Sequence, residues 1–82
     1  MGRRPRDEDP VSSRLLELRS ERGISRGELA EAVGVHYQTI GYLERGEYSP
    51  SLALALRICA VLGVAVEDCF SLEEPGMEAR RA

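Results

Sequence analysis

Residues 23–46 read GISRGELAEAVGVHYQTIGYLERG, and this stretch decides the fold of the chain. Ser25 and Glu28 stand three positions apart in the Ser-x-x-Glu pattern of a capping box, which predicts a helix over residues 26–33. Gly34 follows at once, and glycine is the residue type that most often takes the left-handed conformation at the end of a helix. The stretch therefore opens with one short helix whose two ends are both marked.

A second helix is predicted over residues 36–45, and Gly46 ends it. Its apolar positions Ile40 and Leu43 are three residues apart, so they lie on one face and are expected to point inward. The connection between the two helices is too short for anything but a tight turn. The helices must therefore cross at a steep angle, which is the geometry of a helix-turn-helix motif.

Three more helices are predicted around this pair, over residues 13–22, 52–62 and about 67–71. Ser12 or Ser13 is the expected N-cap of the first helix. Ser51 is the expected N-cap of the second, which Gly63 closes. No stretch alternates apolar and polar side chains as a half-buried strand does. The prediction is an all-α fold, a compact bundle of five helices.

The 82 residues can form one small domain, and 43% hydrophobic with 30% charged residues is a normal globular balance. We expect a disordered arm over residues 1–11, the domain over 12–72 and a flexible tail over 73–82. No apolar run is long enough to span a membrane and no signal-peptide pattern opens the chain, so the expected location is the cytoplasm. In that reducing compartment, Cys59 and Cys69 are expected to be small core residues.

An ordered set of short motifs runs through residues 14–71, each of them weak when taken alone. The set reads Arg14-Leu15-x-x-Leu18-Arg19, Gly23-Ile24-Ser25-x-x-Glu28-Leu29-Ala30, Val33-Gly34-Val35-x-x-Gln38-Thr39-Ile40-x-x-Leu43-Glu44-x-Gly46, Pro50-Ser51-Leu52-x-Leu54-Ala55, Leu62-Gly63-Val64 and Asp68-x-Phe70. In this order the set resembles the Cro/C1-type helix-turn-helix family, also called the XRE family, in its short stand-alone form. The resemblance implies a lambda-repressor-like DNA-binding domain and a sequence-specific transcriptional regulator, with repression favoured over activation.

The resemblance places the helix over residues 36–45 in the DNA major groove. The exposed face of that helix then provides the side chains expected to read bases, which are His36, Tyr37, Gln38 and Tyr42. The amide of Gln38 is suited to bidentate pairing with adenine N6 and N7. His36 has a second interpretation, because it also stands where an N-cap or a phosphate contact is expected.

A second set of side chains is expected to hold the DNA backbone, namely Arg26, Thr39, Arg45 and Tyr48. Arg26 opens its helix, where backbone amides already favour phosphate. Gly41 lowers the stability of its helix by about 1 kcal/mol relative to alanine. Either something approaches this glycine closely on the exposed face, or it packs against the preceding helix.

Two further sets of residues have structural roles in this interpretation. The resemblance implies a partly buried ion pair between Arg19 and Glu44, which ties the first helix to the third. The helix over 52–62 is apolar on nearly all sides: Leu54, Ile58, Val61 and Leu62 are expected to fill the core, which leaves Ala53, Leu56 and Ala60 outside it. Extra apolar surface needs covering, so we expect a homodimer whose interface contains Leu56, Ala60 and Phe70.

Other function classes are weighed against DNA binding. With one histidine, no lysine and no glycine-rich phosphate loop, the sequence does not favour an enzyme, and we expect no cofactor, metal ion, small-molecule ligand or membrane partner. The competing interpretation is a protein-interaction module, or an antitoxin-like adaptor, that keeps the same fold. Its support is the net charge of −2 over residues 23–50, where two arginines stand against four glutamates. Arg3, Arg4 and Arg6 either reach DNA or belong to a solvated tail.

Overall fold

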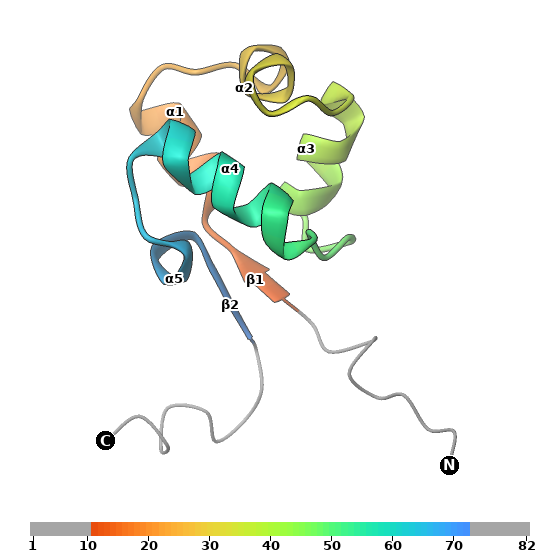
Figure 1. The fold of residues 1–82 in the computed structure, drawn as a ribbon, viewed down its shortest axis with the longest axis vertical. Coiled ribbons are helices and arrows are strands. Elements are labelled where there is room, and N and C mark those ends of the chain that lie inside the picture. The colour runs from red at the N-terminus through yellow and green to blue at the C-terminus, as the bar shows by residue number, and fades with distance from the viewer. Residues whose placement is uncertain (1–10, 73–82) are drawn as a thin grey trace.

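The structure is a computed structural model that describes residues 11–72, and five helices run through it in the predicted order (Figure 1). They are α1 (Leu15–Glu21), α2 (Arg26–Val33), α3 (Tyr37–Glu44), α4 (Leu52–Leu62) and α5 (Val66–Cys69). The bounds of α2 and α4 match the prediction to the residue, and α1 and α3 are shorter than predicted by one or two residues at each end. The predicted bundle of five helices is confirmed.

The ends of α2 show why the central stretch folds as its sequence indicates. The Ser25 hydroxyl accepts a hydrogen bond from the Glu28 backbone amide at 3.0 Å, and the Glu28 carboxylate accepts one from the Ser25 amide at 2.9 Å. Gly34 ends the helix with a φ of 81°, a conformation that glycine adopts without strain. Both ends of α2 are therefore fixed locally, and only three residues separate it from α3.

The predicted N-cap of α1 is wrong. Arg14 occupies that position, while the Ser13 hydroxyl accepts a hydrogen bond from the Leu15 amide at 3.1 Å. The reason is that Ser12 and Ser13 are part of a strand, so their backbone is already extended and paired before the helix begins.

A small antiparallel sheet that the sequence analysis did not predict joins the two ends of the described chain. Strand β1 (Val11–Ser13) pairs with β2 (Phe70–Leu72), and Val11 lies opposite Leu72 (Figure 1). Val11 therefore belongs to the folded domain and not to the expected disordered arm, and the last predicted helix stops at residue 69. Three-residue strands are too short to show alternation, and their pairing depends on contacts distant in sequence. The rest of the predicted arm and tail, with Arg3, Arg4 and Arg6, lies outside the described residues.

One aliphatic core holds the helices together. All five helices contribute side chains that are completely or almost completely buried. These are Leu15, Leu29, Ile40, Leu43, Ile58 and Cys69. Cys59 is 2% exposed as well, so both cysteines are core residues as predicted. The expected core role of Val61 is wrong, since its side chain is 41% exposed at the far end of α4.

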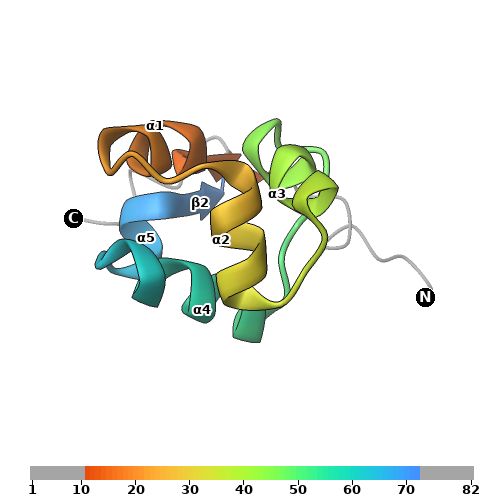
Figure 2. The same cartoon turned by 90° about the horizontal axis from the view of Figure 1, so that it is seen from above.

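The arrangement of the helices leaves α3 at one edge of the molecule. Figure 2 shows α2 between α3 on one side and α1, α4 and α5 on the other. Ile40 and Leu43 anchor α3 to the core with exposures of 0% and 1%. The opposite face of α3 is consequently uncovered.

Within residues 11–72, no helix is long and apolar enough to cross a membrane.

Candidate nucleic-acid interface

The N-terminus of α3 is capped by a histidine. His36 has an extended backbone, and its Nδ1 accepts a hydrogen bond from the Gln38 amide at 3.1 Å. The structure thus places His36 at the N-cap, the second of its two sequence interpretations. With Nδ1 used as the acceptor, the proton of the neutral ring is on Nε2, which is the nitrogen left to donate to a ligand. The ring lies 4.8 Å from that of Tyr37, centroid to centroid.

A shallow hollow of about 170 Å³ lies on the outer face of α3. Its lining residues come from α2, α3 and the residue after α3, and they are Arg26, Tyr37, Gln38, Gly41, Tyr42 and Arg45. Five of these six are residues that the sequence analysis selected for base or backbone contact. Tyr37 and Tyr42 remain 53% and 45% exposed, so their rings and hydroxyl groups are available at the rim.

The remaining selected residues lie outside this hollow. Thr39 is half-buried within α3, and Tyr48 is 49% exposed in the loop that follows the helix. Like His36, these two residues are not among those that line the hollow.

Two arginines share one buried carboxylate beneath the interface. Glu44 at the end of α3 is 2% exposed, and its Oε2 accepts a hydrogen bond from Arg19 Nε at 2.7 Å. Its Oε1 accepts one from Arg26 Nε at 2.9 Å. The contact between Arg19 and Glu44 is the one that the family resemblance implies, whereas the sequence analysis did not anticipate that Arg26 joins it. Arg26 keeps a half-exposed side chain, and its two terminal nitrogens are not used in that contact.

Arg45 folds back over the middle of α3. A Cβ placed on Gly41 would lie 3.3 Å from Arg45 Nη1 and 4.0 Å from Nη2. The guanidinium carbon lies 5.3 Å from the centroid of the Tyr42 ring, and Nε is 3.2 Å from a Glu47 carboxylate oxygen. The close approach at Gly41 thus comes from a side chain one helical turn further on. No atom of α2 lies within 4 Å of that Cβ, and Gly41 itself is buried.

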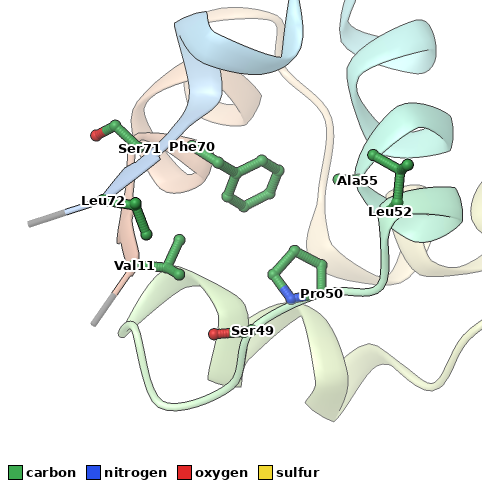
Figure 3. Close-up of a pocket in the computed structure, with 8 residues that line it drawn as sticks. All are labelled: Val11, Ser49, Pro50, Leu52, Ala55, Phe70, Ser71 and Leu72. Atoms are coloured by element: carbon green, nitrogen blue, oxygen red, sulfur yellow. The ribbon is translucent and has the colours of Figure 1, made fainter. Parts of the chain in front are cut away.

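A second hollow, of about 350 Å³, lies away from α3 where the small sheet meets the start of α4. It is lined by Val11, Ser49, Pro50, Leu52, Ala55, Phe70, Ser71 and Leu72. Figure 3 shows the Phe70 ring between the two strands on one side and Pro50 and α4 on the other, while the Ser71 side chain points away. We call this the apolar hollow. Its rim includes Leu52 and Leu72, which are 71% and 42% exposed.

The residues expected at a dimer interface lie near this region in part. Leu56 is 52% exposed, and Ala60 is exposed one turn further along α4. Phe70 differs from them, since it is 9% exposed, belongs to the core and shows only an edge to the apolar hollow. Within this single chain Phe70 is a core residue, and its role at a dimer interface stays a prediction.

The cysteines offer little chemistry in this structure. Burial raises the pKa of the Cys69 thiol to about 12, and burial also raises the pKa of the Cys59 thiol. Both thiols are therefore protonated and shielded at neutral pH. Within residues 11–72, no group of three or more His, Cys, Asp or Glu side chains is placed to hold a metal ion.

A capped pair of short helices, a steep turn and an uncovered polar face on the second helix define a helix-turn-helix domain. The family model described as helix-turn-helix, HTH_3, matches residues 15–69. The chain belongs to this family, the Cro/C1 or XRE type of DNA-binding transcriptional regulator. The family is a class of DNA-binding regulators and not a class of enzymes.

Similar proteins share this assignment. An uncharacterized HTH-type transcriptional regulator of Methanothermobacter thermautotrophicus is 56% identical over 63 residues, which cover 76% of this chain and 91% of that protein. The uncharacterized HTH-type transcriptional regulator YgzD of Bacillus subtilis is 45% identical over 64 residues, covering 78% and 97% respectively. Among solved structures, the clp gene regulator ClgR of Corynebacterium glutamicum superimposes with a TM-score of 0.63 at 37% identity. That match covers 66% of this chain and 57% of the ClgR chain.

Proposed function

We propose that this chain is a cytoplasmic, homodimeric regulator that represses transcription by occupying an operator, with α3 in the major groove. The observation that carries the proposal is the hollow on the outer face of α3. Five side chains chosen from the sequence for DNA contact line it, and no carboxylate is among its lining residues. A major groove about 12 Å wide admits one helix and presents a distinct donor and acceptor pattern for each base pair.

The proposed division of labour follows the position of each side chain. Tyr37, Gln38 and Tyr42 line the hollow and face the bases, with the Gln38 amide pairing with an adenine. His36 adds the Nε2 donor at the N-terminus of the helix, which is where base contacts concentrate in this motif. Arg26 sits on the first turn of α2, so its free terminal nitrogens are placed to hold a phosphate.

Backbone contacts from Thr39 and Tyr48 complete the proposed footprint. Thr39 lies on the first turn of α3, and Tyr48 stands in the loop after it. A single domain of this size offers a small interface, so dimerisation supplies both affinity and site length. A two-fold dimer reads two half-sites about 34 Å apart, one turn of DNA.

The proposed dimer contact is the exposed apolar face of α4. Leu52, Leu56 and Val61 expose 71%, 52% and 41% of their surface on one short helix, and the apolar hollow continues from its first turn. Several large apolar side chains exposed on one short helix favour a protein partner. Leu56→Asp is expected to give a monomer in sedimentation equilibrium, whereas Leu16→Asp, at a similarly exposed leucine of α1, is expected to leave the dimer intact.

The experiment for the whole proposal is selection of genomic DNA fragments by the purified protein, followed by titration of the enriched fragment across salt. A palindromic site with half-sites one turn apart supports the operator-reading dimer. If a folded, dimeric protein enriches no fragment, the interaction module or antitoxin-like adaptor becomes the better interpretation. The net charge of −2 over residues 23–50 is the observation that keeps this second candidate in consideration.

A further inference from the structure

We infer that Arg45 reads a guanine in each half-site and does not contact the DNA backbone as its sequence position first suggested. The inference rests on the proposed operator-reading function and names one base that α3 recognises. Three features of the structure carry it: the helix face on which Arg45 lies, the glycine beneath its guanidinium group, and the carboxylate that occupies its Nε.

The first feature is a shared face. Gln38 and Tyr42 are one turn apart on the same face of α3, and Arg45, the C-cap residue, stands at i+7 from Gln38, where that face ends. All three line the same hollow. If the amide of Gln38 faces the base edges, the guanidinium of Arg45 faces the edges of base pairs further along the same groove.

The second feature is the notch at Gly41. The terminal nitrogens Nη1 and Nη2 of Arg45 lie 3.3 and 4.0 Å from the place where a Cβ would stand on this residue. A Cβ at position 41 would be in tight contact with Nη1, and the guanidinium would have to shift by a few tenths of an ångström. Glycine is a poor helix former, so its presence in mid-helix lowers the stability of α3. Room for the Arg45 guanidinium gives a reason for it. The notch keeps the guanidinium against the middle of α3.

The third feature is the pairing of Arg45 with its neighbours. A Glu47 carboxylate oxygen lies 3.2 Å from Nε in an exposed ion pair, and the guanidinium carbon lies 5.3 Å from the centroid of the Tyr42 ring. Nη1 and Nη2 remain as a pair of parallel donors, which match O6 and N7 of guanine. The nearby carboxylate also repels a phosphate, whereas the edge of a guanine carries no net charge. The arrangement therefore favours a base over the backbone.

The test is a selection from a randomised operator library with the wild type and three variants. The wild type is expected to enrich a guanine at one fixed position of each half-site, with a preference of about 5- to 150-fold over other bases. Arg45→Lys keeps the charge but lacks the fork, so that preference is expected to disappear while the other positions stay selective. Arg14→Lys, at an exposed arginine outside both the proposed DNA face and the proposed dimer contact, is the matched control and is expected to leave every position unchanged.

Gly41→Ala is the second, independent variant. It keeps Arg45 and its charge and improves helix propensity, so failure to fold is not expected. Because the new methyl group crowds Nη1 and shifts the guanidinium by a few tenths of an ångström, the same guanine preference is expected to fall, by less than it falls in Arg45→Lys. Replacing that guanine with 7-deazaguanine, which lacks the N7 acceptor, is expected to weaken the wild type and to leave Arg45→Lys unaffected.

The outcomes separate this inference from the function on which it rests. If the wild type enriches no site, the operator-reading function fails and the inference falls with it. If the wild type enriches a site but Arg45→Lys weakens all sequences equally and relaxes no position, Arg45 contacts a phosphate and the inference alone is overturned. If only Arg45→Lys loses the preference and Gly41→Ala keeps it, the notch has no role.

Discussion

Replacing Glu44 with glutamine is expected to destabilise the domain more than neutralising any one exposed charge. The Glu44 carboxylate is 2% exposed and receives hydrogen bonds from both Arg19 and Arg26. The Arg19 side chain is only 12% exposed, so the loss of its partner leaves a nearly buried cation without a counter-charge. Breaking a buried ion pair from one side costs about 3–5 kcal/mol.

This loss of stability is large compared with the whole free energy of unfolding. A domain of this kind has a free energy of unfolding of about 5–15 kcal/mol, so Glu44→Gln removes about a fifth of it or more. The assay is urea unfolding followed by circular dichroism at 222 nm, with the slope of the transition checked for constancy. Arg26→Gln is expected to cost under about 1 kcal/mol in the same assay, because Arg26 is 47% exposed and its pairing is screened by water.

The control for this prediction is an exposed ion pair within one helix turn. Arg14 and Glu17 form a hydrogen-bonded pair at 3.1 Å with side chains 51% and 55% exposed. Glu17→Gln is expected to leave the unfolding midpoint within measurement error. If Glu44→Gln lowers stability no more than Glu17→Gln does, the buried carboxylate does not organise the domain and the reasoning from its burial is refuted.

Three further predictions concern the interface and the core. Gln38→Ala is expected to cost about 1–3 kcal/mol of operator binding and to relax selectivity at one base position, and equal weakening of all sequences in a competition assay contradicts base reading. Arg26→Ala is expected to weaken binding to every sequence and to lower the salt slope of log K by about one per half-site, whereas an unchanged slope in titrations from 50 to 200 mM salt contradicts a phosphate contact. Burial raises the pKa of the Cys69 thiol to about 12, so between about pH 9 and 12 the folded protein keeps a proton that the unfolded thiol has lost. The free energy of unfolding is therefore expected to fall over this range by up to about 1.4 kcal/mol per pH unit. Urea unfolding at several pH values, compared with Cys69→Ala, checks this, and an equally steep fall in the variant contradicts it.

The parts of the fold that could be predicted are those whose signals are local. Ser25, Glu28 and Gly34 mark the two ends of α2 within ten residues, and Ser51 and Gly63 do the same for α4. Each of these contacts joins residues that are close in sequence, so a pattern in the sequence specifies it. The helix bounds were accurate at these caps for that reason.

The parts that were missed depend on contacts between distant residues. The strands β1 and β2 pair across nearly the whole domain, and neither is long enough to carry a pattern of its own. Val61 lies at the edge of an almost uniformly apolar helix, where composition does not distinguish inside from outside. The sharing of Glu44 by Arg26 depends on how α2 crosses α3, an angle that the short turn makes steep but does not specify.

The site shows the same division between local and distant information. Ile40 and Leu43 mark the buried face of α3, so the side chains of its outer face could be selected from the sequence as the remaining positions. The position of Arg45 over Gly41 could not, because the rotamer of a long side chain depends on its neighbours. A glycine four residues before an arginine on an exposed helix face was the available signal.

The structure also changes the weight of the acidic charge that favoured a protein-only adaptor. Of the four glutamates in residues 23–50, Glu28 completes the cap of α2 and Glu44 is buried beneath two arginines. Glu47 is paired with Arg45, and Glu31 lies on α2. No residue of α3 itself puts a carboxylate on its outer face, since Glu44 points into the domain, and the Glu47 carboxylate beside that face is paired with Arg45. The formal charge counts these side chains equally, whereas the field at a DNA surface depends on where they lie. A count of −2 is therefore compatible with a face that accepts a polyanion.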